Sequence, residues 1–215
     1  MSTAAAGSDH HHAHHFKSGD HEFVTCKQGM WLFLLQEVLF FAPLFVMYAL
    51  LRGLYPASFV EGATFLDPRM GGLNTIILIS SSLSMAMAVS GAQRGNKQRT
   101  VWGLALTLLF ALGFLVVKYF EYSHKLHIGI TTAGSFSNTA VTDPNSPLFF
   151  SLYFIMTGLH GIHVVGGMVV IFWILLRARR GEFGPKYYTP VEMVGLYWHF
   201  VDLVWIYLFP LLYLI

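Results

Sequence analysis

The chain has 215 residues, of which 55% are hydrophobic and only 11% are charged. Soluble domains carry about 25% charged residues, so this composition excludes an ordinary soluble protein. The formal net charge of +2 says little about partners, and we expect no nucleic-acid partner. The single cysteine, Cys26, excludes an intrachain disulfide.

The first 29 residues are rich in small and polar residues, and they include His10, His11, His12, His14, His15 and His21. Histidine-rich tracts have some affinity for divalent metals. Low hydrophobicity over the whole segment nevertheless favours a chain without stable packing. We therefore predict that residues 1–29 form a disordered, weakly metal-affine tail on the cytoplasmic side of a membrane.

Five apolar stretches follow the tail, at about residues 30–54, 73–92, 101–120, 148–176 and 191–215. A membrane-spanning helix needs roughly 20 such residues. We therefore predict an all-α protein in which residues 30–215 form one domain, an integral membrane bundle of five transmembrane helices.

The basic residues are distributed unevenly between the two sides of such a bundle. The tail and the loops after the second and fourth stretches carry Lys17, Lys27, Arg94, Lys97, Arg99, Arg177, Arg179, Arg180 and Lys186. The other side carries Arg52, Arg69, Lys125 and, at a helix end, Lys118. Short cytoplasmic loops are enriched in Lys and Arg, so we predict a cytoplasmic N-terminus and an extracytoplasmic C-terminus.

Small residues predict where the helices pack closely. In the second stretch two stripes of small residues recur, namely Ser80, Ser84, Ala88 and Ala92, and beside them Ser82, Ala86 and Ser90. The fourth stretch contains Gly158, Gly161, Gly166 and Gly167. Small side chains let two membrane helices approach each other. Both sets therefore predict contact between helices.

Three apolar stretches contain ionisable groups that are expensive to place in a membrane. They are Glu37 in the first stretch, His160 and His163 in the fourth, and His199 and Asp202 in the fifth. A charged group at the bilayer centre costs roughly 2.5 to 3.5 kcal/mol on insertion scales. Each histidine pair or histidine–aspartate pair is spaced by three residues and shares one helix face, so we expect these groups to point into protein.

Lys118 and Glu121 have the same spacing near the end of the third stretch. A lysine near a helix end can extend its ammonium to the membrane surface. We therefore predict a surface ion pair or a snorkelling lysine at this position.

Two functions based on these groups are alternatives. Helix bundles do hold metals with carboxylates and histidines, but the chain lacks the paired Glu-x-x-His units of a di-iron site, so we expect no metal centre. A small proton-coupled transporter would use Glu37 and Asp202 as a relay, although five spans do not divide into two inverted halves.

Four segments carry a resemblance to a known family: residues 29–41 (GMWLFLLQEVLFF), 73–75 (LNT), 157–164 (TGLHGIHV) and 197–205 (YWHFVDLVW). In this order they resemble a helix with a membrane glutamate, the opening of the next helix, a Gly-x-His-Gly-x-His motif and a terminal signature. Residues 120–122 (FEY) resemble a third-helix end more weakly. The chain is similar to subunit III of the haem-copper respiratory oxidases, which include cytochrome c and quinol oxidases, in its five-span form.

The resemblance implies a noncatalytic subunit without haem, copper or catalytic residues of its own. Haem and copper would lie in partner subunits of the oxidase. Subunit I would pack directly against this chain, and subunit II and further subunits would complete the complex. Subunit III of this family binds phospholipid and supports sustained proton uptake by a proton-pumping complex that reduces O₂ to water.

The resemblance also assigns roles to single residues. Glu37 corresponds to a buried carboxyl near a lipid cleft, and Arg177 to an arginine that meets lipid phosphate at the cytoplasmic surface, where a guanidinium pairs well with phosphate. The residues expected to form internal hydrogen bonds that fix helix register are His160, His163, His199, Asp202 and Glu121.

Two features depart from the family pattern. The first two helices of its seven-span form are absent, and Lys118 stands where an uncharged or acidic residue is expected. We predict a bacterial inner membrane protein whose complex takes electrons from cytochrome c. A quinol oxidase subunit III and an accessory protein of a nitric oxide reductase are alternatives within the same pattern.

Overall fold

A computed structural model describes residues 19–132 and 136–215 of the chain. Its helices are α1 (Gly19–Leu54), α2 (Pro56–Thr64), α3 (Pro68–Gln93), α4 (Lys97–His127), α5 (Ser146–Arg180) and α6 (Thr189–Tyr213). Over these two ranges the chain forms no β-strand, so the prediction of an all-α protein is confirmed.

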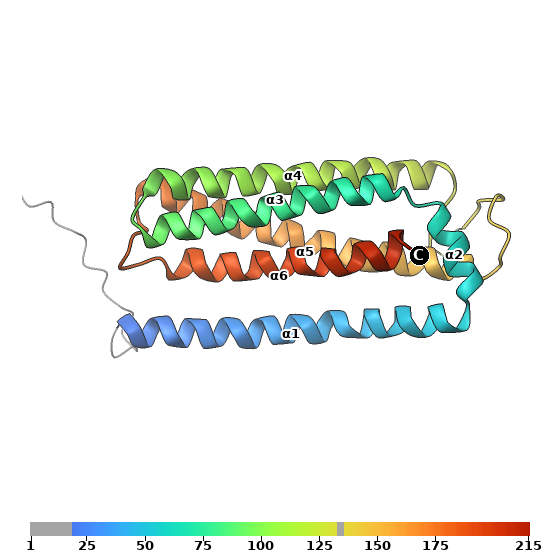
Figure 1. Ribbon diagram of the computed structural model, residues 1–215, viewed down its shortest axis with the longest axis horizontal. Coiled ribbons are helices and arrows are strands. Elements are labelled where there is room, and N and C mark those ends of the chain that lie inside the picture. Colours follow the sequence, from blue (N-terminus) through green and yellow to red (C-terminus); the bar gives the residue numbers. More distant parts are fainter. Residues whose placement is uncertain (1–18, 133–135) are drawn as a thin grey trace, which may run out of the picture.

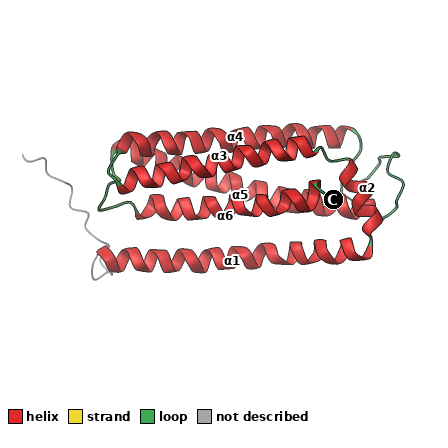
Figure 2. Cartoon of the chain, viewed as in Figure 1, coloured by secondary structure: helices red, strands yellow, loops and turns green. Residues whose placement is uncertain are grey.

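Four of the long helices pack as a ring, in which α3 and α5 each contact both α4 and α6. The remaining long helix, α1, contacts α6, α2 and α5, and it lies alongside the ring rather than within it (Figure 1). The short helix α2 and the long loop before α5 lie at the same end of the bundle (Figure 2). We call this end the α2 end.

Five helices of the described residues are long and apolar enough to cross a membrane, as predicted: α1, α3, α4, α5 and α6. Helix α1 begins at Gly19. The prediction of a disordered tail is therefore wrong for residues 19–29, and the other tail residues, including five of the histidines, lie outside the described residues. Helix α4 continues to His127, beyond the predicted end at residue 120. Polar residues also form helices, so the length of an apolar stretch underestimates the length of the helix.

Local sequence signals explain where several helices begin and end. Asp67 accepts a hydrogen bond from the backbone N–H of Arg69 at 2.9 Å, and Asn96 accepts one from Arg99 at 3.0 Å. These side chains cap the starts of α3 and α4. Gly181, with φ of 80°, ends α5 in the left-handed conformation that glycine adopts most easily.

The closest helix contact joins α3 to α4. A Cβ atom on Gly103 would lie 2.8 Å from the backbone nitrogen of Ala88 and from the backbone oxygen of Ser84. Ser84, Ala88 and Ala92 are all buried. The predicted small-residue face of α3 therefore packs against another helix, α4, which contributes Gly103 to the contact.

Candidate functional site

The first polar contact inside the bundle joins α1 to α5. Glu37 Oε2 lies 3.0 Å from His163 Nε2, and His163 Nδ1 lies 2.9 Å from the carbonyl oxygen of Leu159. A carbonyl oxygen only accepts hydrogen bonds, so Nδ1 carries a proton. Nε2 and Glu37 then hold one further proton between them. Either an imidazolium faces a carboxylate, or a neutral imidazole accepts from a carboxylic acid.

Aromatic rings shield this pair. The ring of Phe41 lies 5.0 Å from that of His163, and the ring of Phe40 lies 6.0 Å from it, centroid to centroid. The Tyr197 hydroxyl donates to the backbone carbonyl of His163 at 3.1 Å, which adds a link to α6. Glu37 itself is buried. The pair thus holds its proton in surroundings that are mostly apolar.

The second polar contact joins α6 to α3. His199 Nδ1 lies 2.6 Å from the hydroxyl of Ser82, and Asp202 Oδ2 lies 3.5 Å from the hydroxyl of Ser81. The indole N–H of Trp198 donates to the same Ser81 hydroxyl at 3.0 Å. His199 and Asp202 therefore point into protein, as predicted, and each meets a serine of α3.

His160 occupies a different environment from His163, although the two lie on one side of α5. Its ring is fully buried and lies 5.5 Å from Phe114 and 5.4 Å from Trp205, centroid to centroid. Within the described residues neither ring nitrogen of His160 has a hydrogen-bond partner. The hydrogen bond predicted for His160 is thus replaced by contact with aromatic rings of α4 and α6.

The third polar cluster is an ionic network near the α2 end. Glu121 lies 3.0 Å from the ammonium of Lys118 and 3.1 Å from that of Lys125. It also accepts from the hydroxyls of Tyr153 at 2.9 Å and Tyr213 at 2.6 Å. The Tyr213 hydroxyl in turn accepts from Lys118 at 2.6 Å. All five side chains are buried, so the prediction of a surface ion pair is wrong.

Arg177 lies at the opposite end of α5. Its Nε donates to Glu182 at 2.6 Å, and its guanidinium lies 4.9 Å from the ring centroid of Trp173 and 5.2 Å from that of Phe183. The side chain keeps 23% of its surface exposed. The guanidinium is therefore oriented by an acid and two rings, with part of its surface still accessible.

Metal-ligand side chains do not gather anywhere in residues 19–132 and 136–215. No three of the histidines, cysteines, aspartates and glutamates in these ranges lie together as they would around an ion. His160 and His163 face different helices, and His199 faces serine, so the histidine spacing in the sequence does not translate into a shared ligand set.

Comparison with known proteins identifies the family. The model of the family described as cytochrome c oxidase subunit III matches residues 8–215. The chain belongs to this subunit III family. It is 38% identical over 189 residues to cytochrome c oxidase subunit 3 of Corynebacterium diphtheriae, covering 87% of this chain and 86% of that protein. It is 36% identical over 188 residues to cytochrome c oxidase subunit 3 of Synechocystis, covering 87% of this chain and 74% of that protein.

A further relative within the oxidases joins two subunits in one chain. The haem-copper oxidase subunit I+III of Aeropyrum pernix is 31% identical over 195 residues, covering 88% of this chain and 22% of that protein. The part that matches this subunit III chain is therefore a minor part of the fused protein.

Sequence reasoning missed three members of the ionic network in this subunit III chain: Lys125, Tyr153 and Tyr213. One signal was available, because Lys125 follows Glu121 by four residues and such pairs lie side by side on a helix. The two tyrosines come from α5 and α6 and gave no signal. Their approach to Glu121 depends on which helices are neighbours.

Proposed function

We propose that this chain is the noncatalytic subunit III of a proton-pumping haem-copper terminal oxidase that reduces O₂ to water. Haem and copper would reside in the partner subunits, with subunit I packed directly against this chain and subunit II completing the complex. The chain would support sustained proton uptake by subunit I, stabilise that subunit and bind phospholipid. Membership of the subunit III family is the basis of the proposal.

The observation that carries the proton-uptake role is the contact between Glu37 and His163 at 3.0 Å. It places an ionisable pair, which holds one exchangeable proton, between α1 and the rest of the bundle. Buried ionisable groups in membrane helices are costly and commonly serve proton transfer. The other internal polar residues, namely His160, His199, Asp202 and Glu121, have the structural role of fixing helix positions in this proposal.

Phospholipid binding would use Glu37 and Arg177. Arg177 keeps part of its guanidinium exposed beside Trp173, and a guanidinium forms two parallel hydrogen bonds with a phosphate. An aromatic side chain next to such a cation suits the membrane interface, where tyrosine and tryptophan are enriched. Glu37 lies on α1, the helix that is least enclosed by the rest of the chain.

The proposed partner subunit, the electron donor of the complex and the orientation of the chain in the membrane rest on separate observations. The fused subunit I+III of Aeropyrum pernix supports direct packing against subunit I. The names of the two bacterial relatives support cytochrome c as donor and a bacterial inner membrane as location. The excess of Lys and Arg in the N-terminal tail and in the α3–α4 and α5–α6 loops supports a cytoplasmic N-terminus and an extracytoplasmic C-terminus.

The variant Glu37→Gln tests the proton-uptake role in the purified complex. A glutamine amide fills the same space but does not exchange the proton that the pair holds. We expect the initial rate of O₂ reduction to stay near the wild-type value. Activity over many turnovers should decay several-fold faster, or fewer protons should be pumped per electron, as measured with an oxygen electrode and a pH-sensitive dye in liposomes.

Glu192→Gln provides the control, because Glu192 also links α6 to α1, through Lys27 at 2.9 Å, but lies at the end of the membrane helix. This variant should decay at the wild-type rate. If Glu37→Gln also loses activity at the wild-type rate and pumps as many protons per electron as wild type, Glu37 has no part in proton uptake.

A further inference from the structure

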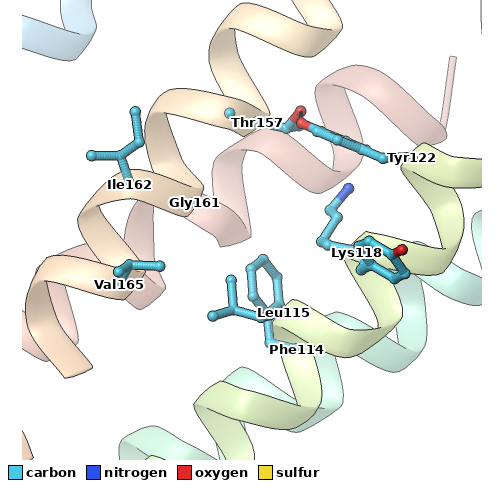
Figure 3. Close-up of a pocket in the computed structure, with 10 residues that line it drawn as sticks. Phe114, Leu115, Lys118, Tyr122, Thr157, Gly161, Ile162 and Val165 are labelled. Atoms are coloured by element: carbon cyan, nitrogen blue, oxygen red, sulfur yellow. Dashed lines mark hydrogen bonds between the residues drawn. The ribbon is translucent and has the colours of Figure 1, made fainter. Parts of the chain in front are cut away.

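A groove between α4 and α5 lies beside the ionic network, with which it shares Lys118. Its volume is about 390 Å³, within the range of about 300 to 1,000 Å³ typical of small-molecule sites. Phe114, Leu115, Ile162 and Val165 form most of its apolar lining, as Figure 3 shows. The groove opens on the surface of α4 and α5, where Tyr119 and Ile162 are strongly exposed.

Two glycines create the hollow. A Cβ atom on Gly161 would meet no other atom within 4 Å, and one on Gly158 would meet only the Tyr122 hydroxyl, at 4.0 Å. Gly167 differs, since its Cβ would lie 2.8 Å from the indole of Trp198. The prediction of close helix contact is therefore confirmed for Gly167 and, within this chain, wrong for Gly158 and Gly161. Within this chain their missing side chains leave space for another molecule.

The groove is polar at one end and apolar at the other. Helix α4 runs toward the α2 end and α5 runs away from it, so Lys118, Tyr122 and Thr157 line the end nearer α2. Phe114 and Val165 line the end nearer the middle of the bundle. This polarity matches an amphiphile whose head points toward the α2 end.

The depth of Lys118 matches the head region of a lipid. Lys118 lies two residues before the end of the apolar stretch 101–120, about 3 Å along a helix. The apolar stretch ends there, so we take this level as the boundary between the hydrocarbon and the ester and phosphate groups. The molecule in the groove therefore has its polar atoms at the level of Lys118 and its apolar part deeper.

Lys118 also has hydrogen-bonding capacity to spare. An ammonium has three N–H groups, and those of Lys118 donate to Glu121 at 3.0 Å and Tyr213 at 2.6 Å. One N–H remains beyond these two bonds. The hydroxyls nearby are already engaged, because Tyr122 bonds to Thr157 and Thr157 donates to the backbone of Tyr153. The ammonium also lies 4.7 Å from the ring centroid of Trp205 and 5.8 Å from that of Tyr122, so a ligand oxygen would compete with these ring faces for the remaining N–H.

We propose that this groove binds one glycerophospholipid of the leaflet at the α2 end. One acyl chain lies over Gly158 and Gly161, and an ester or phosphate oxygen accepts a hydrogen bond from Lys118. The polar end formed by Lys118, Tyr122 and Thr157 suits a lipid head better than the apolar side of a partner helix. The site lies on a different part of the bundle from Glu37 and Arg177, and it depends on the chain lying in a membrane and not on its role in an oxidase.

The variant Gly161→Leu tests this site, because Gly161 lines the groove and an added Cβ there meets no other atom within 4 Å. Gly166→Leu is the matched control on the same helix, where an added Cβ meets only the Tyr197 hydroxyl at 4.0 Å. Each complex is purified from its membrane in mild detergent and examined by native mass spectrometry. Gly161→Leu should retain one phospholipid fewer per chain than wild type, and Gly166→Leu the same number as wild type. Equal retention by all three overturns the proposal.

A cryo-electron microscopy map of the wild-type complex in phospholipid nanodiscs gives a second readout. Density for a lipid, with one acyl chain along the groove and its head near Lys118, supports the proposal. A helix of another subunit in the groove, or no ordered density there, overturns it. The haem content of the same preparations reports separately whether the chain assembles into an oxidase.

Discussion

The buried carboxylate of Glu121 is the centre of the ionic network near the α2 end. Two ammonium groups and two tyrosine hydroxyls surround its carboxylate. Asp67, at the start of α3, also attracts the ammonium of Lys125 electrostatically. Burying ions is expensive, and breaking a buried pair on one side leaves the other charge without compensation. Glu121 is therefore the residue that compensates the buried positive charges of Lys118 and Lys125.

We expect Glu121→Leu to lower the free energy of unfolding by about 3 to 5 kcal/mol, because Lys118 and Lys125 would remain buried without their shared carboxylate. Glu182→Gln removes a more exposed acid that pairs with Arg177, and it should cost less than about 1 kcal/mol. Unfolding of the purified chain in mixtures of sodium dodecyl sulfate and a mild detergent measures both values. Equal losses in the two variants would show that the network adds no stability.

At the scale of single residues, sequence predicts which groups avoid lipid better than it predicts what they meet. His199 and Asp202 point into protein because their burial in lipid would be costly. His160 and His163, three residues apart, are separated by about 60° around the helix. That angle is wide enough for one to face α1 and the other α4 and α6.

At the scale of elements, Glu61 joins α2 to the loop before α5. Glu61 accepts hydrogen bonds from the hydroxyls of Ser146 and Thr142, both at 2.6 Å. The backbone N–H groups of Thr142 and Asp143 add bonds at 2.8 and 3.1 Å. These bonds, that of Ser146 first, lower the pKa of Glu61 from 4.5 to about 2. The ionised carboxylate therefore fastens the loop before α5 to α2.

This lowered pKa predicts how the loop responds to acid. The contribution of Glu61 is fully present above its unfolded pKa of 4.5 and is lost as the pH falls toward about 2. Hydrogen-exchange protection of the amides of Thr142 and Asp143 should therefore fall over this range. In Glu61→Gln the protection should be lower at pH 6 and should not change between pH 4.5 and 2. Wild-type protection that is constant down to pH 2 would contradict this role of Glu61.

Helix α2 also shows what length and composition fail to predict. The spans were predicted because each has enough apolar residues to cross a membrane. The nine residues of α2 are too few for that criterion, and they lie between the predicted spans 30–54 and 73–92. Pro56 at the first helical turn is a start signal. The anchor of α2, however, is a loop more than 80 positions away in the sequence.

At the scale of the whole molecule, α1 is joined to the bundle less extensively than the other spans. In its most apolar 18-residue segment, 22% of the residues are buried, against 44% in α6. Polar links along its length include Lys27 with Glu192, Glu37 with His163, and the Tyr48 hydroxyl with the carbonyl of Leu211. Apolar burial adds little to helix association in lipid, so such links count for more there.

We expect the triple variant Lys27→Gln, Glu37→Leu and Tyr48→Phe to loosen α1 while the ring of α3 to α6 stays intact. Interhelical hydrogen bonds in membranes average about 0.6 kcal/mol and reach about 1.7 kcal/mol. Removing three of them therefore weakens the attachment of α1 by about 2 to 5 kcal/mol. None of the three changes removes a contact between two helices of the ring.

Pulsed electron paramagnetic resonance measures this loosening as a distribution of distances between spin labels. Val46 on α1 and Ile206 on α6 are exposed and suit a reporter pair, after the native Cys26 is replaced by serine. Leu109 on α4, paired with Ile206, gives a control within the ring. The reporter distribution should broaden in the triple variant, because α1 then samples several positions, while the control distribution keeps its width. Broadening of both would mean that the ring itself depends on α1, and broadening of neither would mean that apolar packing alone holds α1.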